Sequence, residues 1–129
     1  MRKITLVFVA GLMLSAEAPP PREVHLDIAT AQSKEILVAC IEHLISGLKV
    51  KEVPLDGGGV RLEFTQANNL FGRPPMMYWS IIPKGSENHL AVAYRHPMSE
   101  STAAKDIRIV GRKCFPYELE AAGGGRLSQ

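Results

Sequence analysis

Between residues 48 and 96 the chain repeats short runs of alternating apolar and polar side chains, separated by turns rich in glycine, proline and asparagine. The clearest run is 60–65, where Val60, Leu62 and Phe64 alternate with polar residues. A period of two is typical of a β-strand with one buried face. Successive strands without intervening helices exclude a doubly wound parallel sheet and favour an antiparallel meander.

Five segments in all carry a strand pattern, and the one at 76–82 is apolar on both faces, as a central or covered strand would be. Residues 56–59, Asp-Gly-Gly-Gly, predict a hairpin turn because glycine tolerates the positive φ that such turns require. The predicted strands span residues 48–55, 60–65, 76–82, 89–96 and 106–114.

Ahead of these strands, residues 27–46 repeat apolar side chains with the helical period, Leu37, Cys40, Ile41 and Leu44 among them. An amphipathic helix of this kind needs a sheet to cover its apolar side. The sequence therefore predicts an α+β two-layer sandwich, with one N-terminal amphipathic helix packed on a mostly antiparallel sheet of four to five strands.

The first residues have the three-part layout of a secretory signal peptide: a basic start, an apolar run at 4–14, and a small-residue stretch that permits cleavage after Ala16 or Ala18. The apolar run is too short to span a bilayer. We expect a periplasmic or secreted protein with no stable membrane span in its mature form. The expected organisation is a signal peptide at 1–18, a proline-rich extended spacer at 19–26, one domain at 27–120 and a flexible glycine-rich tail at 121–129.

The chain contains two cysteines, Cys40 and Cys114. Export to an oxidising compartment permits them to pair, so the sequence predicts a disulfide across most of the domain. A catalytic thiol and an intermolecular bridge are the alternatives.

Charge argues against two classes of partner. The chain has 15 basic and 13 acidic residues, and removal of the signal peptide would leave a net charge of +1. Nucleic acid and anionic membranes are held by a summed cationic field that this composition does not supply. Neither is expected as the partner.

Motifs for catalysis are missing from the sequence. It contains no phosphate-binding glycine loop, no nucleophile elbow and no zinc-protease helix. His89 and His96 would lie on opposite faces of a strand, so they cannot share a metal. Thr102 and Lys105 could form a nucleophilic pair on a helix, but a solvent-exposed turn explains the same residues and is the preferred interpretation. We expect no catalytic residues, no cofactor and no metal.

One stretch, residues 69–79, concentrates the side chains that most often anchor protein interfaces. Its candidate binding residues are Phe71, Arg73, Met76 and Tyr78. Trp79 and the neighbouring Met77 could instead fill the core under the helix.

These features favour a non-catalytic envelope protein that binds another protein or a peptide, as an inhibitor or an assembly accessory, through this stretch and a sheet edge. A small hydrolase that pairs a histidine with Asp56, Glu63 or Asp106 is the second hypothesis. A carrier of a small apolar ligand is the third.

Overall fold

The computed structural model of the chain describes residues 20–69 and 72–122, apart from the side chains of His25 and Asp27. The predicted signal peptide, Phe71 and most of the predicted tail lie outside these residues. Within them, no helix has the length and apolar character needed to cross a bilayer.

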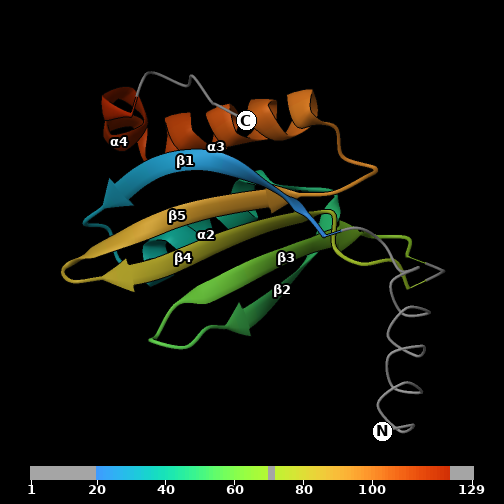
Figure 1. The fold of residues 1–129 in the computed structure, drawn as a ribbon, viewed down its shortest axis with the longest axis horizontal. Coiled ribbons are helices and arrows are strands. Elements are labelled where there is room, and N and C mark those ends of the chain that lie inside the picture. Colours follow the sequence, from blue (N-terminus) through green and yellow to red (C-terminus); the bar gives the residue numbers. More distant parts are fainter. Residues whose placement is uncertain (1–19, 70–71, 123–129) are drawn as a thin grey trace, which may run out of the picture.

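The described strands form one antiparallel sheet in the order β1-β5-β4-β3-β2 (Figure 1). Strands β2 to β5 are a meander, and β1 joins its far side by pairing with β5. Two helices follow the last strand. The elements in chain order are β1 (Arg22–Thr30), α2 (Lys34–Leu44), β2 (Leu48–Pro54), β3 (Val60–Gln66), β4 (Met77–Lys84), β5 (Glu87–Tyr94), α3 (Glu100–Cys114) and α4 (Pro116–Ala121).

The predicted two-layer sandwich with a single N-terminal helix is wrong. The described chain begins with strand β1, which occupies the end of the predicted spacer and the start of the predicted helix. The helix that follows is shorter, Lys34–Leu44. Residues 106–114 are not a strand, because they belong to α3, and α4 comes after them. Helices therefore flank the meander in sequence on both sides.

Local signals explain where the two longer helices begin. The Ser33 hydroxyl accepts a hydrogen bond from the Ile36 amide at the start of α2, and the Ser99 hydroxyl accepts one from the Thr102 amide at the start of α3. Such caps satisfy amides that have no partner inside the helix. The Ser99 hydroxyl also donates to Thr102 Oγ1, over 2.9 Å. The Thr102 hydroxyl thus takes part in a helix cap.

One face of the sheet is the inner face, and α2 lies against it, behind the strands in the view of Figure 1. Strands β3 and β4 bury every second side chain there. Trp79 is fully buried and packs 6.3 Å from the Phe115 ring, centre to centre, at the end of α3. The core combines this pair with inner-face side chains of the strands and with apolar side chains of the helices, including Leu37, Ile41, Phe64, Met77, Ile81 and Ile107.

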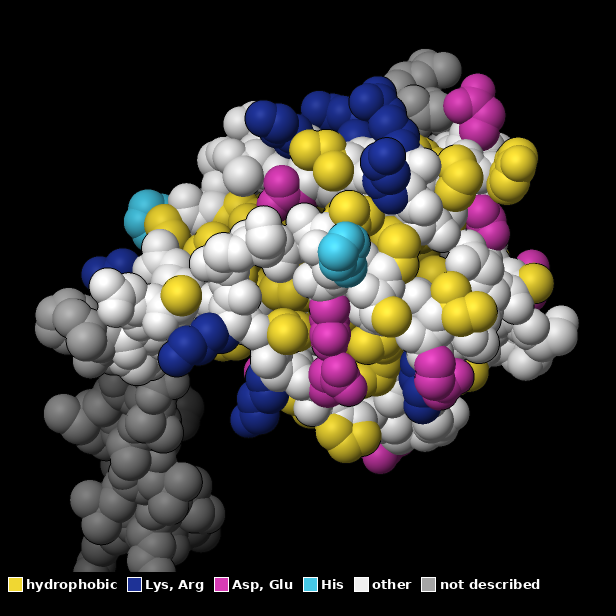
Figure 2. Space-filling view, turned by 180° about the vertical axis from the view of Figure 1, so that it is seen from behind, with side chains coloured by type: hydrophobic (Ala, Val, Ile, Leu, Met, Phe, Trp, Pro, Cys, Tyr) yellow, Lys and Arg dark blue, Asp and Glu magenta, His cyan; other side chains and the backbone are white. Residues whose placement is uncertain are grey.

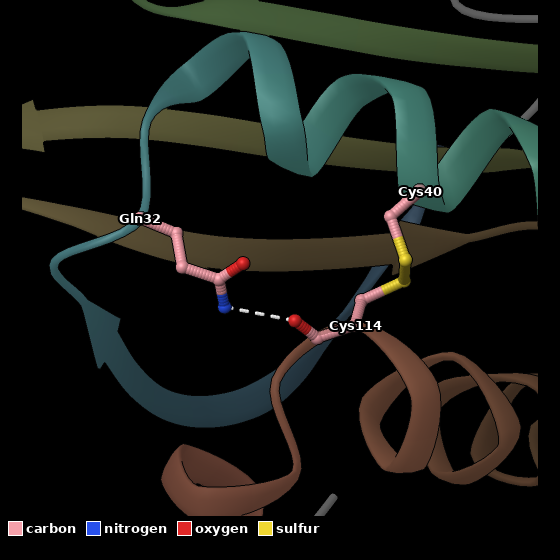
Figure 3. The surroundings of a disulfide bond; sticks show 3 residues. All are labelled: Gln32, Cys40 and Cys114. Atoms are coloured by element: carbon pink, nitrogen blue, oxygen red, sulfur yellow. Dashed lines mark hydrogen bonds between the residues drawn. A yellow bond between two sulfur atoms is a disulfide. The ribbon is translucent and has the colours of Figure 1, made fainter.

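A disulfide between Cys40 and Cys114 joins α2 to the end of α3 (Figure 3). Beside it, the Gln32 side-chain amide donates to the Cys114 carbonyl oxygen over 2.8 Å. The predicted pairing is therefore present, although Cys114 closes a helix onto α2 and not a strand. A disulfide fits an oxidising extracellular or periplasmic environment.

The short helix α4 is fixed to the first strand. The Thr30 hydroxyl donates to Glu118 Oε2 over 2.6 Å, which joins groups 88 residues apart. Gly111 allows the approach of α4 to α3, since a Cβ at this position would lie 2.9 Å from a methyl carbon of Leu119. Both ends of the described chain are thereby attached to the same core.

Candidate binding surface

The outer face of the sheet is the one turned away from α2, and it is visible across β3, β4 and β5 in Figure 1. Alternation along these strands sends its side chains opposite to the buried set. A shallow hollow of about 460 Å³ lies on it. We call this surface the Tyr78 face and define it by the hollow's residues Arg61, Glu63, Tyr78, Ser80, Ala93 and Arg95.

Tyr78 lies at the centre of the Tyr78 face between two arginines. The guanidinium carbon of Arg61 lies 5.7 Å from the centre of the tyrosine ring, and that of Arg95 lies 5.8 Å from it. The sheet register produces this arrangement, because Tyr78 pairs with Glu63 on β3 and with Ala93 on β5. Arg61 is two residues before Glu63 and Arg95 is two residues after Ala93, so both arginines lie on the same face as Tyr78. Cation–π attraction holds both guanidinium groups over the ring.

The two arginines differ in their ionic partners. Arg61 Nε donates a hydrogen bond to Glu63 Oε2 over 2.9 Å, and Arg61 Nη2 lies 2.7 Å from the same oxygen in a salt bridge. Among the described residues Arg95 forms no salt bridge, and its Nε is buried without a hydrogen-bond acceptor. The positive charge of Arg61 is therefore balanced locally, and that of Arg95 is not.

Arg95 also lines a second hollow, of about 350 Å³, which we call the Arg95 hollow. Its other lining residues include Asn69, Arg73, Met76 and His96. The Asn69 side chain is bonded to the backbone of Arg73: it accepts from the Arg73 amide at 2.8 Å and donates to the Arg73 carbonyl oxygen at 2.9 Å. Because both hollows share Arg95, they form one continuous surface.

The structure brings together three of the four candidate binding residues. Arg73 and Met76 line the Arg95 hollow, and Tyr78 lies next to it on the Tyr78 face. Phe71 lies outside the described residues. Met77 and Trp79 fill the core and are not part of this surface, because both are fully buried.

Sequence reasoning missed Arg61 and Arg95. Both stand in runs that were recognised as strands, but their distance from Tyr78 along the chain gives no hint of contact. Only the pairing of β3 with β4 and of β4 with β5 places them beside the tyrosine ring. The short β4–β5 turn gives a register that could have placed Arg95 beside Tyr78, whereas the long connection 67–76 between β3 and β4 gives no such signal for Arg61.

A pair of carboxyl groups lies elsewhere, between α2 and the edge strand β2. Burial first, and then a hydrogen bond and like charge from Glu52, together raise the pKa of Glu42 from 4.5 to about 7. Glu42 Oε2 is buried without a partner among the described residues. The folded protein thus retains a proton on this pair at a pH where the unfolded chain has lost it.

We expect Glu52→Gln to stabilise the protein at pH 8 by about 1 kcal/mol and to change little at pH 5. In the wild-type protein, stability should fall as pH rises from about 4.5 to about 7, because the raised pKa means that the folded state binds more protons there. The effect is modest since Glu52 is exposed and solvent screens the pair. Urea unfolding at both pH values measures it. Glu87→Gln, at the exposed β4–β5 turn, is the matched control and should show the same change of unfolding free energy with pH as the wild-type protein. A Glu52→Gln variant that also shows the wild-type change would contradict the prediction.

The Arg95 hollow does not combine the histidine and carboxylate of the hydrolase hypothesis. His96 lines the Arg95 hollow, but no carboxylate is among that hollow's described lining residues. Asp106 lies on α3, where burial raises its pKa and the nearby Lys105 ammonium partly offsets the increase. In the described part of the chain, no three histidine, cysteine or acidic side chains are grouped so as to hold a metal.

A further basic surface runs along the outside of α3, where Figure 2 shows lysine and arginine side chains gathered at the upper rim. We call it the α3 rim, and it comprises Lys105, Arg108, Arg112 and Lys113. It is a row of partly or fully exposed charges without a hollow among those described above.

Comparison of the chain with protein-family models, curated proteins and solved structures gave no match. Function is therefore inferred from the surface itself.

Proposed function

We propose that this chain is a non-catalytic protein that works in the periplasm or outside the cell and binds another protein or a peptide on the Tyr78 face. The observation that carries the proposal is a tyrosine held between two arginines on a sheet face that no described helix covers. Tyrosine and arginine are enriched among the residues that dominate binding energy at interfaces. The Cys40–Cys114 disulfide supports the oxidising location.

The surface is also suited to recognition in its shape. The hollow on the Tyr78 face is open and shallow, which fits an extended segment better than a small substrate that must be enclosed. Ala91 and Ala93 leave room for a partner backbone to approach β5. The Arg61–Tyr78–Arg95 contacts hold their side chains in place before binding, so that less side-chain entropy is lost when a partner docks.

Affinity capture with Tyr78→Ala tests the proposal. The wild-type protein and the variant are expressed with a tag in the native cells, captured under non-reducing conditions, and the associated proteins are compared. We expect Tyr78→Ala to lower the affinity for a specific partner by at least about 30-fold, as loss of a dominant interface residue does. Tyr117→Ala is the matched control, because Tyr117 is 86% exposed and lies on α4. If the two variants retain every partner equally, the Tyr78 face is not the binding site.

A further inference from the structure

The Arg95 hollow has an unbalanced positive charge. Two arginines, Arg73 and Arg95, and one histidine, His96, line it, and its described lining residues include no carboxylate. The positive charge of the hollow therefore comes from the two arginines, and Thr65, Gln66 and Asn69 are uncharged polar residues of its lining. A cationic concave site of this kind is complementary to an anionic group.

Arg95 is also positioned as a donor that lacks an acceptor. Its side chain is half-buried, its Nε is buried, and no described group accepts a hydrogen bond from this atom. The Tyr78 ring fixes the guanidinium from one side. A buried N–H without a partner is unfavourable, so the guanidinium of Arg95 retains hydrogen-bonding capacity that no described residue uses.

Arg73 faces the same hollow from the loop before β4 and is exposed. The two hydrogen bonds to Asn69 hold its backbone, so the position of its side chain along the rim is restricted. Met76 adds an apolar side chain to the lining of the hollow. An anion with an attached hydrocarbon chain matches this mixture of charge and apolar surface.

We infer that the Arg95 hollow binds a carboxylate of an acidic peptide segment that runs in extended form along the Tyr78 face. The inference rests on the proposed function and specifies its ligand class. In an extended segment every second side chain points the same way, so a Glu or Asp side chain enters the Arg95 hollow while the neighbouring residues cross Tyr78 and β5. Guanidinium and carboxylate form charge-assisted hydrogen bonds of matching geometry.

The hollow is less suited to a phosphate group. Sites for phosphate draw heavily on backbone N–H groups at a helix start or a glycine-rich loop. Here Pro74 and Pro97 contribute two lining residues that have no N–H to give. The charge is concentrated on arginine side chains, and continuity with an aromatic sheet face favours a peptide.

The direct test uses the intact, oxidised protein and a synthetic peptide as the probe. The probe is an acetylated and amidated hexapeptide of alternating Glu and Ala, and the comparison peptide replaces Glu with Gln. Binding is followed by two-dimensional NMR of the isotope-labelled protein. We expect the Glu peptide to shift the signals of residues around Arg95, to bind more weakly as salt is raised, and to bind at least about tenfold more tightly than the Gln peptide.

Charge-removing variants locate the site. Arg95→Gln should weaken binding of the Glu peptide by about tenfold or more. Arg73→Gln should weaken it by a similar factor, and this second substitution does not endanger folding because Arg73 is exposed. The matched control is Arg112→Gln on the α3 rim, an exposed arginine that should leave binding unchanged. If Arg112→Gln weakens the peptide as much as Arg95→Gln and Arg73→Gln do, binding is a general charge effect and the inference is wrong.

Two further arms separate the possible outcomes. Inorganic phosphate, or vesicles of anionic lipid, binding at the Arg95 hollow in preference to the Glu peptide would overturn the peptide assignment. Equal binding of the Glu and Gln peptides would show that the hollow does not recognise a carboxylate. If neither peptide binds while Tyr78→Ala still loses its captured partner, the inference fails and the proposed function stands. If Tyr78→Ala loses nothing, both fail.

Discussion

Replacing Cys40 and Cys114 with alanine together should lower the free energy of unfolding by about 4 to 5 kcal/mol. The two residues are 74 positions apart, so their bond removes a large amount of chain entropy from the unfolded state. A loss of that size approaches the entire stability of a small domain, about 5 to 15 kcal/mol. Urea unfolding followed by far-UV circular dichroism measures it.

Reduction of the wild-type protein supplies the control for this pair of substitutions. A reductant should move the wild-type urea midpoint toward that of the double variant and leave the variant itself unchanged. Because α2 and α3 meet at this bond, the reduced protein should first lose the contact between these two helices. Two free thiols found in the exported protein by mass spectrometry would contradict the prediction. A urea midpoint that does not change when reductant is added would also show that the bond does not contribute to stability.

The four strands of the meander, β2 to β5, could be predicted because short strand-like runs are separated by turn residues, and the alternation in β3 and β5 is one that a helix cannot satisfy. The first strand, Arg22–Thr30, was missed although it alternates as well. Its residues Leu26 and Thr30 are four positions apart, which fits both a strand face and the next turn of a helix. The apolar stripe of α2 follows shortly after and can be extended backward through them. Pairing of β1 with β5, a contact distant in sequence, decides in favour of the strand.

Helix α3 was mistaken for a strand for a related reason. Within residues 106–110, Ile107 and Ile109 alternate with polar neighbours, but Ile109 is exposed while Ile107 is buried. Over the full helix the buried residues recur with the helical period, at Ala103, Ile107, Val110, Gly111 and Cys114. A longer window reveals this period, and Gly111, which resembles a breaker, is in fact where α4 packs closely.

The candidate surface shows the limit of sequence reasoning more sharply. Enrichment in aromatic and arginine residues drew attention to residues 69–79, yet it could not separate Tyr78 from Trp79. A strand sends neighbouring side chains to opposite faces, so one enters the core and the other the Tyr78 face. Which of them is buried depends on which face α2 covers, and that is decided by packing across the whole sheet.

Trp79→Ala should therefore destabilise the protein by about 3 to 5 kcal/mol, because the tryptophan is fully buried and packs against Phe115 at the end of α3. Urea unfolding of the disulfide-intact variant, followed by circular dichroism since the variant has no tryptophan, measures the loss. A Trp79→Ala variant with the stability of the wild-type protein would contradict the expected contribution of this side chain to the core.

Trp79→Phe is the conservative comparison. It keeps an aromatic ring beside Phe115 but removes the Trp79 Nε1 group, which is buried without a hydrogen-bond acceptor among the described residues. Loss of that unsatisfied donor offsets part of the lost packing, so the cost should be only about 1 to 2 kcal/mol. A Trp79→Phe variant as unstable as Trp79→Ala would indicate that the indole N–H has a partner that stabilises the fold. The ratio of the two effects thus measures how much of the contribution of Trp79 comes from ring packing alone.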